Sequence, residues 1–88
     1  MINAKEATEL YIKNINESFK ERGVDVLVQK HIEQAAKENL TAVEYKCNYE
    51  EKLFIEEIEV NTQAMRAWLK TYGYSTSMDI DGNFVVFW

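Results

Sequence analysis

His31 and Cys47 are the only histidine and the only cysteine of the chain, and both side chains are suited to acid–base or nucleophilic catalysis. A catalytic histidine needs a nucleophile beside it and a third group that orients its ring. No spacing in the sequence supplies these partners, so we expect His31 to be a boundary residue of a helix. A Cys–His pair would arise only if the fold brought the two residues together.

Cys47 lies on the apolar side of a predicted strand, which favours a buried, structural thiol. Reactive cysteines need a lowered pKa, whereas the glutamates near Cys47 in the sequence would raise the pKa of its thiol. We therefore predict no catalytic residues and no enzymatic activity.

Glutamates gather in the middle of the chain, at Glu50, Glu51, Glu56, Glu57 and Glu59. A calcium loop needs Asp or Asn at alternating positions and a glycine for its turn, and this stretch has neither. We interpret it as a solvated edge of the fold. The alternative is an acidic surface that imitates the charge of nucleic acid or recruits a basic partner.

Asp79, Asp81 and Asn83 alternate around Gly82, but no glutamate follows at the distance that an EF-hand loop requires. This pattern predicts a tight reversal of the chain. The sequence also lacks a glycine-rich phosphate loop, zinc-ligand spacing and a nucleophile elbow. We therefore expect neither a metal nor a cofactor.

The charge balance excludes two classes of partner. Ten Lys and Arg residues stand against fifteen Asp and Glu residues, a net charge of −5. Nucleic acids and anionic membranes are bound by basic patches that release counterions, so neither is expected as a partner. The chain has no apolar run that could cross a membrane and no signal-peptide segment at its start. Together with the single cysteine, which cannot form an internal disulfide, these two absences predict a cytoplasmic protein.

The first helix is predicted by its cap and by its apolar spacing. Asn3 followed by Glu6 forms a capping box, and apolar side chains then recur every three or four positions over residues 4–22. Gly23 follows two basic residues and is a typical helix end. The expected buried stripe contains Ala4, Ala7, Tyr11, Ile15 and Phe19.

Two further helices are predicted by the same signals. Asp25 is the expected cap of the second helix, whose apolar side contains Val24, Val28, Ile32, Ala35 and Ala36. Asn61 is the expected cap of the third helix, which Gly73 closes and whose stripe contains Met65, Trp68, Leu69 and Tyr72.

After the second helix the apolar period shortens to two, which predicts a half-buried strand over residues 41–48 with the inward positions Val43, Tyr45, Cys47 and Tyr49. Residues 50–60 fit either a hairpin partner of this strand or a short helix capped by Asn48. Their β-branched residues favour the strand.

Residues 74–88 predict a hairpin with Asp81-Gly82 at its turn. A three-residue loop that includes Ile80 is favoured over a two-residue loop, because it groups one apolar set on one face: Tyr74, Thr76, Met78, Phe84, Val86 and Trp88. Val85 and Phe87 then lie on the opposite face and need cover. We expect a homo-oligomer whose interface contains these two residues.

These elements predict an α+β fold in a single domain over residues 1–88. Two N-terminal helices and a third helix pack on a small antiparallel sheet that includes the C-terminal β-hairpin. The residues expected to share one core are Val43, Trp68, Phe84 and Val86.

The opening Met1-Ile2-Asn3-Ala4-Lys5-Glu6-Ala7, which leads into a long charged helix, resembles the start of many small phage- and prophage-encoded accessory proteins of unassigned function. The close is also similar, with a helix ending in Tyr72-Gly73-Tyr74, a polar strand, an Asp-Gly turn and an apolar strand ending in Trp88. Residues 50–60 look like an addition to that pattern. The resemblance implies a phage-encoded protein in the cytoplasm of a bacterial host and carries over no catalytic residues.

These features favour a non-enzymatic accessory protein that acts through protein–protein interaction and self-associates. A host or virion protein would be its further partner. The alternative is an acidic inhibitor or sponge that occupies a host factor or a small ligand.

Overall fold

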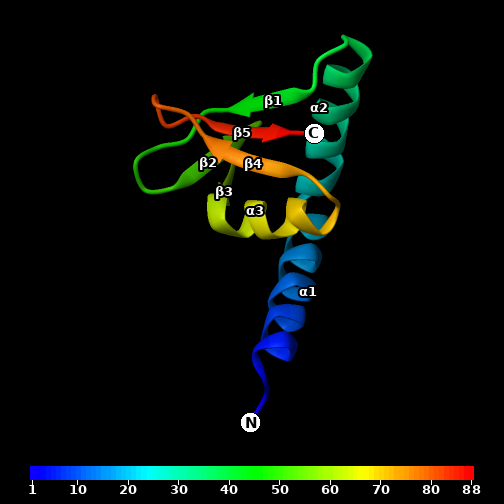
Figure 1. The fold of residues 1–88 in the computed structure, drawn as a ribbon, viewed down its shortest axis with the longest axis vertical. Coiled ribbons are helices and arrows are strands. Elements are labelled where there is room, and N and C mark those ends of the chain that lie inside the picture. The colour runs from blue at the N-terminus through cyan, green and yellow to red at the C-terminus, as the bar shows by residue number, and fades with distance from the viewer.

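The computed structural model describes residues 1–88 and contains three helices and two antiparallel sheets (Figure 1). The helices are α1 (Ala4–Arg22), α2 (Val24–Lys37) and α3 (Thr62–Thr71). The strands are β1 (Ala42–Tyr45), β2 (Lys52–Ile55), β3 (Ile58–Asn61), β4 (Ser75–Met78) and β5 (Phe84–Phe87). The predicted α+β class is confirmed. None of the helices has both the length and the apolar character needed to cross a membrane.

A single glycine joins α1 to α2. Asn3 begins α1 as predicted, because its side chain accepts a hydrogen bond from the backbone N–H of Glu6 at 2.9 Å. Gly23 closes α1 in the left-handed conformation, with φ 71°. The predicted cap of α2 is wrong, since Gly23 also precedes its first residue and Asp25 lies inside the first turn. With one residue between the helices, no position remains for Asp25 as a cap.

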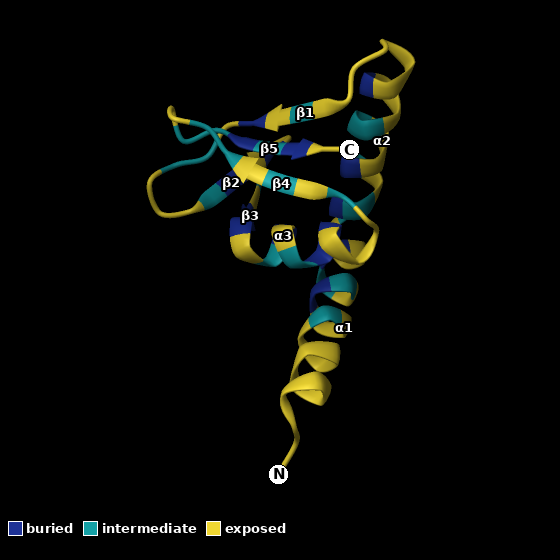
Figure 2. Ribbon diagram, in the orientation of Figure 1, coloured by how far each residue is buried: buried dark blue, intermediate teal, exposed yellow.

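The first half of α1 extends away from the rest of the molecule (Figures 1 and 2). Ile15 and Phe19 are buried as predicted, but Ala4, Ala7 and Tyr11 of the same stripe are exposed. Spacing identifies the apolar face of a helix, whereas burial also needs an element opposite that face. We call the exposed residues 4–11 the arm of α1. The molecule measures 46 Å along its longest axis and 28 and 23 Å across.

β5 is the central strand of the sheet β1-β5-β4. Met78 lies opposite Phe84, which is the register of the predicted three-residue loop and confirms it. Gly82 has φ 82° in this loop, a conformation that glycine adopts without steric cost. The helices cover the face that carries Phe84 and Val86, and both side chains are fully buried.

Residues 50–60 are strands, as favoured, but their partner is not the one predicted. β2 and β3 pair with each other in a separate two-stranded sheet, with Leu53 opposite Val60. A single bridge between Cys47 and Leu53 is the only ladder contact with the preceding strand region. The first strand therefore ends earlier than predicted, at Tyr45.

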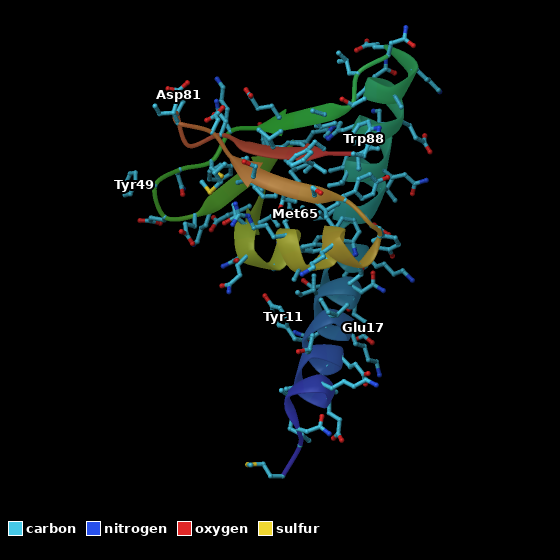
Figure 3. All side chains as sticks on the ribbon, viewed as in Figure 1. Tyr11, Glu17, Tyr49, Met65, Asp81 and Trp88 are labelled. Carbon is cyan, nitrogen blue, oxygen red and sulfur yellow. The ribbon has the colours of Figure 1, made fainter.

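The helical alternative for this region is wrong because Asn48 closes a turn. Its side-chain oxygen accepts hydrogen bonds from the backbone N–H groups of Glu50 and Lys52. Tyr49, predicted to point inward, is 96% exposed in the same turn and projects from the end of the molecule (Figure 3).

One core joins both sheets to the helices. Trp68, Phe84 and Val86 are buried and Val43 packs against them half-buried, which confirms the predicted shared core. Met65 lies between α3 and the sheet (Figure 3). Two residues of the predicted stripes, Ala36 and Tyr72, are exposed instead. The other core members come from every helix and from both sheets: Ile15, Phe19, Val24, Val28, Tyr45, Leu53, Ile55, Val60 and Leu69.

Candidate functional site

His31 has two polar partners that the sequence did not reveal. Its Nδ1 lies 2.8 Å from the hydroxyl oxygen of Tyr45, and its Nε2 lies 3.4 Å from Oε1 of Glu56. The three residues come from α2, β1 and the turn between β2 and β3. The expectation that His31 lacks supporting groups is therefore wrong, because only tertiary folding brings these elements together.

This cluster has the chemistry of a structural contact. Burial, together with the negative charge of Glu56, raises the pKa of the Tyr45 phenol well above its usual range. Tyr45 therefore stays protonated at neutral pH and is a poor nucleophile. Its hydroxyl and His31 satisfy each other and hold β1 against α2, while Glu56 ties the β2–β3 turn to the same helix.

Cys47 is half-buried and is not a partner of His31. Burial raises the pKa of its thiol, and the charge of Glu51 adds to this effect while Arg66 opposes it. A raised pKa keeps the sulfur in the unreactive thiol form at neutral pH.

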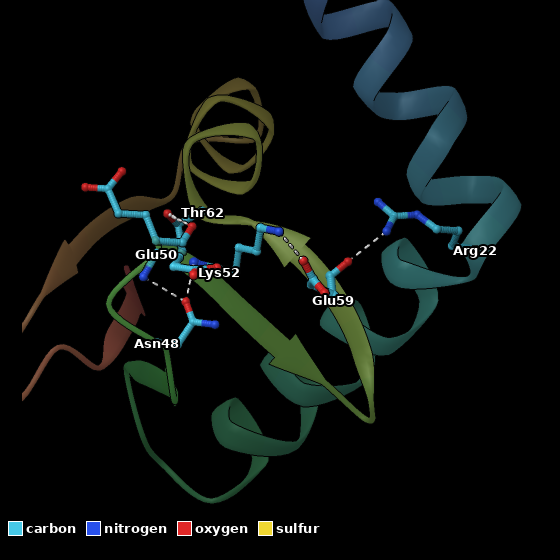
Figure 4. A network of polar contacts seen from close by, with 7 residues as sticks. Arg22, Asn48, Glu50, Lys52, Glu59 and Thr62 are labelled. Atoms are coloured by element: carbon cyan, nitrogen blue, oxygen red, sulfur yellow. Dashed lines mark hydrogen bonds and ion pairs between the residues drawn. The ribbon is translucent and has the colours of Figure 1, made fainter.

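The glutamates of residues 50–59 do not gather on one surface. Glu50 and Glu51 precede β2, whereas Glu56 and Glu57 form the turn at its other end. Glu59 forms an ion pair with Lys52, whose Nζ lies 2.6 Å from Oε1 of Glu59 (Figure 4). This contact raises the pKa of the Lys52 amine.

Backbone atoms of this segment also have structural roles. Arg22 donates to the carbonyl oxygen of Glu59 at 2.8 Å, and the Thr62 hydroxyl donates to that of Glu51 at 2.6 Å. No three His, Cys, Asp or Glu side chains lie close enough together to hold a metal ion.

The Asp79–Asn83 segment forms the tight turn that the sequence predicts. One carboxylate oxygen of Asp79 accepts hydrogen bonds from the backbone N–H groups of Asp81 and Asn83, each at 2.9 Å. Asp81 projects from the end of the hairpin, far from the helices (Figure 3).

Val85 and Phe87 lie on the face of the sheet that the helices do not cover. Val85 is half-buried and Phe87 is 41% exposed, although β5 is the central strand. The residues opposite Phe87 are Ala42 and Ser75, whose side chains are too short to cover an aromatic ring. Opposite Val85 on the same face lie Glu44 and Ser77. We call Val85, Phe87, Ala42, Ser75, Glu44 and Ser77 the outer face of the sheet.

A cleft of about 330 Å³ lies between α2 and the segment that runs from α3 into β4. Trp68, Tyr72 and Tyr74 form its aromatic wall, and Val28 and Leu69 lie at its apolar base. The sequence pattern indicates only that these residues belong to helix stripes or to the hairpin, and the packing of α2 against α3 shows that they surround a cavity. We call this the aromatic cleft.

No protein-family model matches the chain, and no curated protein or solved structure shows significant similarity to it.

Proposed function

We propose that the protein is a non-enzymatic interaction protein that self-associates through the outer face of the sheet. The observation that carries the proposal is the exposed Phe87 ring on the central strand, with Val85 beside it and only Ala42 and Ser75 opposite. Phe87 and Val85 are neighbours on one face of this strand, and the apolar patch that they form together is what a partner would cover.

A second copy of the chain is the simplest cover. When two identical faces meet about a two-fold axis, each Phe87 packs against the partner's short side chains, and one apolar patch serves both subunits. Short side chains around an aromatic ring allow two sheets to approach to the usual distance of about 10 Å.

The alternative, an acidic inhibitor or sponge, has less support. Glu50 and Glu51 lie at one end of β2 and Glu56 and Glu57 at the other, while Glu56 and Glu59 already have partners in His31 and Lys52. The resemblance to phage proteins implies that the proposed oligomer works in the cytoplasm of a bacterial host and acts on a host or virion protein.

Light scattering at micromolar concentration tests the proposal. The wild type should have a molecular mass above the 10.3 kDa of one chain, and the Phe87→Glu variant should be a folded monomer. Phe54→Glu is the matched control, because Phe54 is 49% exposed on the other sheet. A monomeric wild type would contradict the proposal, as would a folded Phe87→Glu protein that keeps the wild-type mass.

A further inference from the structure

We propose that the aromatic cleft binds a short, extended segment of a partner protein in which an apolar residue stands two positions from a lysine or arginine, so that both side chains point to the same face of the segment. This inference is independent of self-association, because the cleft residues belong to the helices and to the start of the C-terminal hairpin, and none of them is on the outer face of the sheet.

The apolar part of the site is already formed. Trp68 is held in place because its indole N–H donates to the side-chain oxygen of Asn16 at 3.2 Å. Tyr72 meets Trp68 edge to face, with ring centroids 5.5 Å apart, yet it is 62% exposed at the mouth of the cleft. A side chain bound there would cover Tyr72 and contact the wall that Trp68 forms, at little cost in ordering the protein.

The two ends of the cleft differ in the charged residues that line them. Lys20 and Asp25 lie on either side of the corner at Gly23, so this end of the cleft carries one charge of each sign. Glu33 lies a little over two turns further along α2, about 12 Å away. No cation lines the cleft at the Glu33 end, and neither of the chain's two ion pairs involves Glu33.

Glu33 is also oriented for binding. Its Oε1 accepts a hydrogen bond from the side-chain amide of Gln29 at 3.2 Å, which leaves Oε2 available to a ligand. A carboxylate beside aromatic rings is the usual environment for a lysine or arginine side chain, which gains from both the charge and the ring faces.

The dimensions fit a peptide segment. A length of about 12 Å corresponds to about four residues of extended chain, and a volume near 330 Å³ is at the lower end of the range for ligand pockets. The predicted segment therefore has its apolar side chain over Val28 and Leu69 and its basic side chain at Glu33.

The test is a library of acetylated and amidated tetrapeptides, screened against the full chain. Binding peptides should contain a basic residue two positions from an apolar one, and they should shift the NMR signal of the Trp68 indole N–H. Selection of acidic or uncharged peptides, absence of any binding peptide at millimolar concentration, or shifts confined to other surfaces would overturn the proposal.

Two matched variants identify the charge that matters. Glu33 and Glu38 both accept a hydrogen bond from a glutamine four residues earlier, but only Glu33 lines the aromatic cleft. Glu33→Gln should weaken binding of a selected basic peptide by roughly two- to fivefold, and Glu38→Gln should not. If the two variants lost the same peptide affinity, the effect would come from the net charge of the protein. This result would overturn the assignment of Glu33.

Phe87→Glu separates this proposal from self-association. This variant should keep the peptide affinity of the wild type, whatever its oligomeric state. Loss of peptide binding in a folded Phe87→Glu protein would contradict a cleft that works within one chain.

Discussion

Phe19 and Trp68 meet edge to face, with their ring centroids 5.1 Å apart and their planes at 84°. This contact joins α1 to α3, two helices that are separated in the sequence by α2, β1 and the β2–β3 hairpin. It lies in the core directly behind the aromatic cleft, so one indole ring serves both the stability of the fold and the wall of the proposed site.

Trp68→Ala should therefore lower the free energy of unfolding by roughly 3–5 kcal/mol, because it opens a cavity among buried side chains. Urea denaturation monitored by circular dichroism measures this loss. Trp88→Ala is the matched control, since Trp88 is 41% exposed and should cost much less. A loss below about 1 kcal/mol for Trp68→Ala would contradict the described core.

Replacing His31 by Ala and Cys47 by Ser in one protein should leave self-association and peptide binding unchanged. The expected loss of stability is modest, about 1–2 kcal/mol, and comes from the Tyr45 hydroxyl losing its partner. Light scattering and peptide titration at a temperature well below the melting transition provide the measurement. If either function disappears in a protein that is still folded at this temperature, these residues have a chemical role.

The Glu56-Glu57 turn predicts a stabilising substitution. Both residues have positive φ, at 46° and 72°, where glutamate is strained and glycine is not. Glu57→Gly should raise the free energy of unfolding by about 0.5–1 kcal/mol. Glu50→Gly removes the same charge from an exposed turn position without a positive φ, and it should not stabilise the protein.

Tyr45 predicts a loss of stability at alkaline pH. Folding raises the pKa of its phenol, whereas the unfolded chain releases this proton near pH 10. Above pH 10 the unfolded state binds fewer protons than the folded state, so the free energy of unfolding falls as pH rises. Below pH 10 Tyr45 is protonated in both states, and this loss of stability does not occur.

A Tyr45→Phe variant isolates this effect, because it removes the titrating group. The difference in unfolding free energy between wild type and Tyr45→Phe should change by up to about 1.4 kcal/mol per pH unit above pH 10. Parallel pH profiles for wild type and Tyr45→Phe would contradict the raised pKa.

Signals that act over a few residues predicted much of this fold. The caps at Asn3 and Asn61 and the left-handed Gly23 are local hydrogen-bond and backbone effects, and the structure contains all three. The β4–β5 register also followed from the sequence, because a slip of one residue would have exposed Phe84 and Val86.

Contacts between elements that are far apart in the chain could not be predicted from the sequence. Nothing in the spacing of His31, Tyr45 and Glu56 indicates that α2, β1 and the β2–β3 turn converge. The same limit explains the arm, since Tyr11 has the spacing of a buried residue and lacks only an element to cover it. The aromatic cleft was missed for the same reason.

The position of β5 at the centre of its sheet affects how the protein is made. β1 and β4 pair only with β5, which is the last of the five strands to leave the ribosome. During translation α1, α2 and the β2–β3 hairpin can form from local contacts. β1 has no strand partner on either edge until β5 has been synthesised. The three-stranded sheet can therefore close only when β5 is available to pair with both neighbours.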